Sequence, residues 1–158
     1  MAQELGKLDI ANFFKQHIPN LILPKLRSNP ELGLKDLKEI QKINWDLVIG
    51  LSMGGVYAIK INSKKTFLIN PGFNISEGIK LKFPEFSSGF KKLEDLPNLA
   101  KNVIGMIAIE DKIRPVTEPI FIQLYGKENL INYPGKHVPG KLELEKYILP
   151  ELLSYLKQ

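Results

Sequence analysis

The sequence predicts a three-layer α/β fold, in which a mostly parallel sheet of about five strands is flanked by helices. Five short, β-prone apolar segments recur along the 158 residues, and stretches with helical spacing mostly lie between them. Near-continuous apolar runs are typical of strands that are buried on both faces of a parallel sheet. Because the length is that of one ordinary domain, we expect a single domain over residues 1–158.

The expected strands are the apolar segments Asn20–Leu26, Trp45–Leu51, Thr66–Asn70, Val103–Ile109 and Asn129–Tyr133. Each run is bounded by residues that favour turns or helix starts, which limits it to the length of a short strand. The alternation of these runs with helical stretches favours crossover connections, and therefore parallel pairing.

Three helices are expected from apolar residues that recur every three or four positions. They span Leu8–His17, Pro30–Ile43 and Leu142–Leu156. Asn29 is a candidate N-cap, and Pro30 suits the first helical position. Pro150 is expected to kink or divide the last helix, because proline has no N–H to donate.

Residues 71–99 contain three Pro and three Gly, and we predict an irregular insertion over one edge of the sheet, which could contain short helices. This span also contains four phenylalanines: Phe73, Phe83, Phe86 and Phe90. They form either a small satellite core or an apolar wall that faces a substrate.

Composition excludes several functional classes. The chain has no Cys, which excludes disulfides, thiolate metal sites and a Cys nucleophile. No apolar run approaches the roughly 20 residues of a membrane helix. The net charge is +5, but Arg27 and Arg114 are the only arginines among 22 basic residues, so a solvated surface is favoured over nucleic-acid binding. We expect a cytoplasmic protein with no metal, no cofactor, and no membrane or nucleic-acid partner.

The segment from Gly50 to Gly54 (GLSMG) matches G-x-S-x-G, the nucleophile elbow, and follows an apolar strand. Ser52 between a strand and a helix must turn sharply, and Gly50 and Gly54 are expected to leave room because they lack Cβ. The N–H of Met53 then points to where an oxyanion would form. The alternatives are a Gly-rich turn without catalysis and, less well matched, a phosphate-binding loop.

A serine nucleophile needs a base, and in this motif the base follows the acid along the chain. His137 is the only His after Ser52, and it lies in the loop between the last expected strand and the last helix. His17 lies on an expected helix before the elbow, and we interpret it as a structural or surface residue. His137 is therefore the candidate base.

The acid that orients the base is expected at the end of Val103–Ile109. Asp111 is favoured because it lies just past the strand end and has a short side chain. Glu110 remains an alternative as the neighbouring residue, and Asp95 is a more distant one. Asp111 could also act only as a helix cap or turn residue.

Three segments together resemble the small bacterial YqiA/YcfP-like α/β-hydrolases. They are Trp45–Ala58 (WDLVIGLSMGGVYA), Phe67–Phe73 (FLINPGF) and Gly135–His137 (GKH). In that family a D-L-x-I-G-x-S-[ML]-G-G elbow precedes a strand that ends in a hydrophobic-N-P stretch, and a P-G-x-H loop precedes the C-terminal helix. The resemblance covers about Asn20 to the C-terminus, and the elbow is its most specific part.

The resemblance implies an α/β-hydrolase-like, N-terminally reduced fold and an esterase-like serine hydrolase with Ser52, Asp111 and His137 as its triad. The substrate class is then a small carboxylic ester or thioester. Family members carry a His-Gly loop that supplies the second oxyanion donor, and this sequence contains no His-Gly dipeptide.

We therefore favour direct pairing of Asn20–Leu26 with Trp45–Leu51 in a rewired five-stranded sheet. The alternatives are a strand supplied by another chain and a gene start that lies upstream. With Met53 as the one sure oxyanion donor, we expect weak activity. The first alternative function is a non-catalytic binding or regulatory protein that keeps the elbow as a relic of its ancestry. The second is a binder of nucleic acid or another anionic surface, motivated by the +5 charge.

Overall fold

The computed structural model describes residues 7–22, 24, 26–27 and 29–158, and within them four strands form one sheet. The strands are β1 (Trp45–Leu51), β2 (Ser63–Ile69), β3 (Val103–Ala108) and β4 (Leu130–Tyr133). They are hydrogen-bonded in the order β1-β2-β3-β4, and every pair is parallel. Their carboxyl ends therefore share one edge, which is where parallel sheets place ligands and reacting groups.

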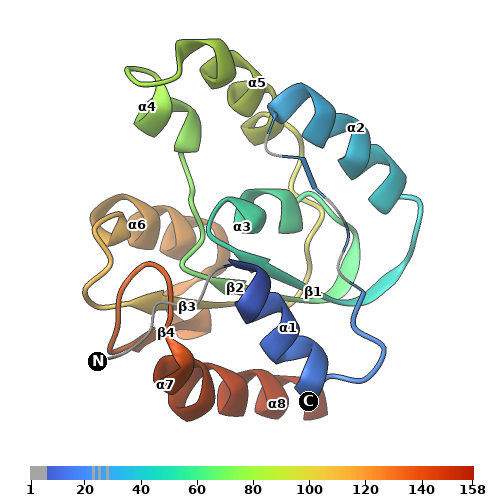
Figure 1. Ribbon diagram of the computed structural model, residues 1–158, viewed down its shortest axis with the longest axis vertical. Helices are drawn as coiled ribbons and strands as arrows, with labels where there is room; N and C mark the ends of the chain where they lie inside the picture. The colour runs from blue at the N-terminus through green and yellow to red at the C-terminus, as the bar shows by residue number, and fades with distance from the viewer. Residues whose placement is uncertain (1–6, 23, 25, 28) are drawn as a thin grey trace.

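Helices cover both faces of this sheet, so the predicted three-layer α/β architecture is confirmed (Figure 1). One face carries α2 (Pro30–Ile40), α3 (Met53–Ala58), α5 (Pro84–Glu94) and α6 (Arg114–Tyr125). The other face carries α1 (Lys7–His17), α7 (Lys141–Glu143), the π-helical turn η2 (Leu144–Ile148) and α8 (Leu149–Lys157). The remaining elements are α4 (Ile75–Ile79) and the 3₁₀ turn η1 (Lys127–Asn129).

Alternation along β2 divides its side chains between the two cores. Leu68 packs among the helices of the α2 and α3 face, while Phe67 and Ile69 pack against the α1 and α8 face. All three are fully buried. Successive strand residues point to opposite faces, so a sheet covered on both sides requires apolar residues at consecutive positions.

The predicted helices begin close to where they begin in the structure, but one of them ends earlier than predicted. Asn29 caps α2, since its Oδ1 accepts hydrogen bonds from the backbone N–H of Glu31 (3.0 Å) and Leu32 (3.1 Å). The helix ends at Ile40, however, and Ile43 is half exposed instead of continuing the apolar stripe. The C-terminal helix is divided at η2, directly before the first turn of α8, which contains Pro150. This division is the one predicted from the missing N–H of Pro150.

The predicted strand over Asn20–Leu26 is wrong. Residues 20–22, 24 and 26 form no strand, and residues 23 and 25 lie outside the described residues. Asn20 has a left-handed backbone (φ 63°) and Pro24 has no N–H, and both features are unsuited to a central strand. Leu21 packs on the α1 face and Leu26 on the α2 face, so the segment crosses between faces. Within the described residues, the sheet has four strands and β1 is an edge strand.

Residues 71–99, expected as an irregular insertion that could contain short helices, are more regular than their composition suggested. This span folds into α4 and α5, and Pro84 takes the first-turn position of α5. Helix α5 packs against α2, where a Cβ on Gly89 would lie only 2.5 Å from Pro30 Cγ. Phe73 and Phe90 join the main core of this face, so they form no separate satellite core.

Candidate active site

Ser52 occupies the turn between β1 and α3 in a backbone conformation that side chains rarely adopt. Its φ is 53° and its ψ is −124°, a combination that favours glycine. Three backbone hydrogen bonds hold the turn: Ser52 N–H donates to Ile69 O (3.0 Å), and the N–H groups of Gly55 and Gly72 each donate to Ser52 O (2.9 Å). The surrounding backbone therefore maintains the strain at the residue that carries the hydroxyl.

The close packing behind the turn depends on a different pair of glycines from the pair predicted. A Cβ on Gly50 would lie 2.7 Å from both Ala58 Cβ and Gly55 Cα, as the need for room predicts. A Cβ on Gly54 would meet no atom within 4 Å, so the expectation for that residue is wrong. Gly55 is the second crowded position, because its Cβ would lie 2.7 Å from Pro71 Cβ.

The three side chains predicted to act together form one continuous chain of hydrogen bonds. Ser52 Oγ lies 2.7 Å from His137 Nε2, and His137 Nδ1 lies 2.8 Å from Asp111 Oδ2. Asp111 is only 4% exposed, and its other oxygen accepts the N–H of Ile113 (3.0 Å). A buried carboxylate facing Nδ1 favours the tautomer with the proton on Nδ1, which leaves the Nε2 lone pair toward the serine hydroxyl.

The alternative residues lie elsewhere. Glu110 is exposed, and Asp95 is exposed at the end of α5, where it pairs with Lys91. His17 is exposed on α1, and its Nδ1 bonds to the carbonyl of Phe13 (2.8 Å). The geometry thus brings Asp111 to His137 and leaves these other carboxylates and His17 without a place in the hydrogen-bonded chain.

The loop that carries His137 is tied to the turn that carries Asp111. Ile109 N–H donates to Tyr133 O (2.9 Å), and Glu110 N–H donates to Gly135 O (3.0 Å). Gly135 has a φ of 147°, which suits glycine at this turn. These bonds continue the β3–β4 pairing beyond the strand ends, so they hold the turn of the acid beside the loop of the base.

Met53 supplies the candidate oxyanion donor. It is the first residue of α3, where the initial N–H groups have no acceptor within the helix. It directly follows Ser52 in sequence, so its N–H lies on the same turn as the nucleophile. This place in the chain agrees with the predicted oxyanion role of its N–H, which stays a prediction.

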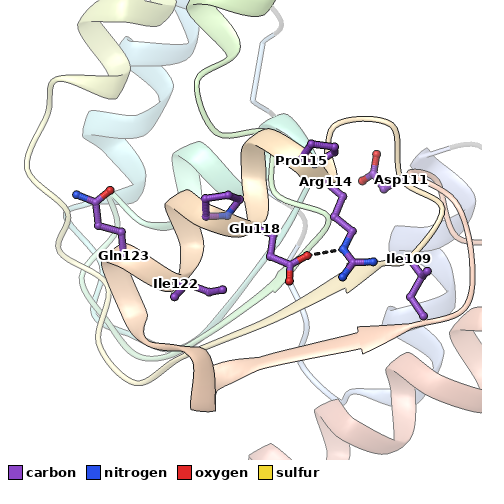
Figure 2. A pocket seen from close by; sticks show the side chains of 8 residues that line it. Ile109, Asp111, Arg114, Pro115, Glu118, Ile122 and Gln123 are labelled. Atoms are coloured by element: carbon purple, nitrogen blue, oxygen red, sulfur yellow. Dashed lines mark hydrogen bonds and ion pairs between the residues drawn. The ribbon is translucent and has the colours of Figure 1, made fainter.

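A shallow, largely apolar groove lies beside the acid (Figure 2). Its lining comes from the end of β3, the following turn and one face of α6: Ile109, Asp111, Arg114, Pro115, Glu118, Pro119, Ile122 and Gln123. Arg114 pairs with Glu118 within this groove, and that hydrogen bond raises the pKa of the guanidinium. The Arg114 guanidinium therefore pairs with Glu118, while the Asp111 carboxylate bonds to His137.

Sequence reasoning missed Asn70, whose side-chain amide contacts the His137 loop. The available signal was an Asn-Pro pair directly after an apolar run, where a polar side chain would meet the ends of the neighbouring strands.

Comparisons with known proteins add no assignment: no protein-family model matches the chain, and no curated protein matches it. In the described ranges, no group of three or more His, Cys, Asp or Glu is placed to hold a metal ion. None of the helices described is both long enough and apolar enough to cross a membrane.

Proposed function

We propose that this chain is a serine hydrolase with an α/β-hydrolase-like fold, acting on a small carboxylic ester or thioester. One observation carries the proposal: a strained serine between a parallel strand and a helix is joined through His137 to a buried Asp111 by hydrogen bonds of 2.7 and 2.8 Å. The resemblance of the elbow and of the His137 loop to small α/β-hydrolases supports the same conclusion.

In the proposed reaction, Ser52 Oγ attacks the substrate carbonyl while His137 Nε2 takes the hydroxyl proton. The Met53 N–H stabilises the developing oxyanion. The carbon–oxygen or carbon–sulfur bond to the leaving group then breaks, and His137 returns the proton to that group. Water repeats the cycle on the acyl-serine, releasing the acid and restoring the serine. The Asp111 carboxylate holds the imidazole and stabilises its charged form in both halves.

The described sheet supports a slow reaction. In α/β-hydrolases a second oxyanion N–H comes from a loop of a neighbouring strand, whereas β1 has a sheet partner on one side only among the described residues. Loss of one oxyanion donor costs roughly 100- to 1000-fold in rate. The same edge also motivates the alternative, a non-catalytic binding protein that retains the elbow.

A fluorophosphonate probe with intact-mass detection separates the two functions. A hydrolase should gain one covalent adduct, and Ser52→Ala should gain none. His137→Ala should label at close to background, and Asp111→Asn somewhat faster than His137→Ala, because the three residues act as a unit. Ser88→Ala and His17→Ala are matched controls on exposed helix positions and should label like the wild type. Labelling that persists in Ser52→Ala, or no labelling of the wild type, would reject the proposal.

A further inference from the structure

We propose that Asn70 is a positioning residue that sets the His137 loop against the Asp111 turn. This inference rests on the proposed function, because positioning matters only if His137 and Asp111 act on Ser52. Asn70 is completely buried and directly follows β2, so it lies between the strand of the nucleophile and the strand of the acid.

The side-chain amide of Asn70 bridges two segments that carry the acid and the base. Its Oδ1 accepts the N–H of Ala108 (2.7 Å), the last residue of β3. Its Nδ2 donates to the carbonyl of His137 (2.7 Å) and, at a longer 3.2 Å, to the carbonyl of Lys136. Ala108 O in turn accepts the N–H of Asp111 (3.2 Å). One amide therefore joins the backbone that holds Asp111 to the backbone of His137 itself.

The partners determine both the residue type and the orientation of the amide. An N–H faces one end and two carbonyls face the other, so the side chain must accept at one atom and donate at the next. An ionised Asp would place a second acceptor against those carbonyls. The hydroxyl of Tyr133 also accepts from Nδ2 (2.7 Å), so the two 2.7 Å contacts, to Tyr133 and to His137 O, take both N–H groups and the 3.2 Å contact to Lys136 O is the weaker one. Burial raises the pKa of Tyr133, which keeps this hydroxyl neutral.

The backbone of Asn70 is also held away from its preferred region. Its φ is 44°, and a proline follows, although a residue before proline favours extended conformations. Its own N–H still donates to Met106 O (2.8 Å), so the β2–β3 ladder fixes the residue while the side chain turns toward the loop. Strain of this kind persists only where surrounding contacts over-determine it.

The test uses Asn70→Ala with Asn102→Ala as its matched control. Both asparagines have a positive φ (44° and 47°), so both alanine variants carry a similar backbone cost. Asn102 lies just before β3, at the opposite end of the sheet, where its Nδ2 donates to Lys64 O (2.9 Å) and its residue is exposed. Two readouts are measured: the rate of reaction with fluorophosphonate, and the low-field Nδ1 proton signal of His137 by NMR.

The expected result for Asn70→Ala is a 10- to 100-fold slower reaction, since small misplacements of reacting groups have effects of this size. The Nδ1 proton signal of His137 should move or broaden, whereas Asn102→Ala should match the wild type in both readouts. An unaltered His137 spectrum and rate in folded Asn70→Ala would overturn the inference. A loss of thermal stability alone, with both readouts unaltered, would overturn it as well.

The NMR readout needs no turnover, so it keeps this inference separate from the proposed function. If the wild type does not react with the probe, the hydrolase proposal fails, while the His137 spectrum still tests Asn70. If Asn70→Ala does not fold, hydrogen exchange of the Asn70 side-chain amide in the wild type decides instead. Protection relative to the Asn102 amide is expected, and exchange as fast as that of Asn102 would reject the bridge.

Discussion

The strain at Ser52 predicts that its two smallest replacements differ in stability. Ser52→Ala and Ser52→Gly both lose the hydrogen bond to His137 Nε2, a shared cost of about 0.5–1.5 kcal/mol. Only alanine keeps a Cβ at φ 53° and ψ −124°, a conformation that costs about 1–3 kcal/mol. Glycine removes that strain but orders a more flexible chain, at about 0.5–1 kcal/mol. The difference is about 0–2.5 kcal/mol, so we expect Ser52→Gly to be about 1 kcal/mol more stable than Ser52→Ala.

Urea unfolding followed by far-UV circular dichroism measures this difference. Ser88 is the matched control, because it is exposed within α5. There Ser88→Gly should be less stable than Ser88→Ala by about 1 kcal/mol, since glycine weakens a helix interior. The order of stability should therefore reverse between the two positions. If Ser52→Gly is less stable than Ser52→Ala, as at Ser88, the elbow does not hold Ser52 under strain.

Other properties of the fold and site should respond as follows. Gly55→Ala should lower the free energy of unfolding by about 1–3 kcal/mol through overlap with Pro71, whereas Gly54→Ala should cost nothing or stabilise slightly, as urea midpoints would show. Burial raises the pKa of Tyr125 to about 12, so above about pH 10 the unfolded chain binds fewer protons than the folded chain and stability falls. Tyr125→Phe should make this alkaline decline shallower in urea unfolding from pH 9 to 11, and an unaltered slope would contradict it.

The candidate site was predictable from sequence where chemistry and chain order coincide. Ser52 stands in a motif that requires a strand before it and a helix after it, and both are present. His137 was the one remaining histidine after the elbow, and Asp111 followed the expected strand end. Parallel strands bring their carboxyl ends to one edge, so three residues far apart in sequence could be expected to meet.

Other features depend on partners that no local pattern reveals. Asn20–Leu26 is apolar enough for a strand, yet Leu21 and Leu26 pack on opposite faces, and only the arrangement of α1 and α2 decides that. The irregular composition of residues 71–99 obscured α5, whose place depends on contact with α2. The crowding at Gly55 arises from Pro71, which follows the next strand.

The sequence by itself determined the α/β class, a mostly parallel sheet built from its strongest apolar runs, and the Ser and His of the candidate site, and it favoured Asp111 over Glu110 as the acid. These follow from periodicity and motif spacing, which are properties of neighbouring residues. The tertiary structure alone decided that β1 is an edge strand of the described sheet and that Gly55 rather than Gly54 must lack a side chain. It also showed that Asn70 bridges the acid and base segments. Its side-chain oxygen accepts from Ala108, 38 positions along the chain, and its side-chain nitrogen donates to His137, 67 positions along the chain. Such contacts depend on the packing of distant segments, because hydrogen-bond partners and steric overlap exist only once those segments are placed in space.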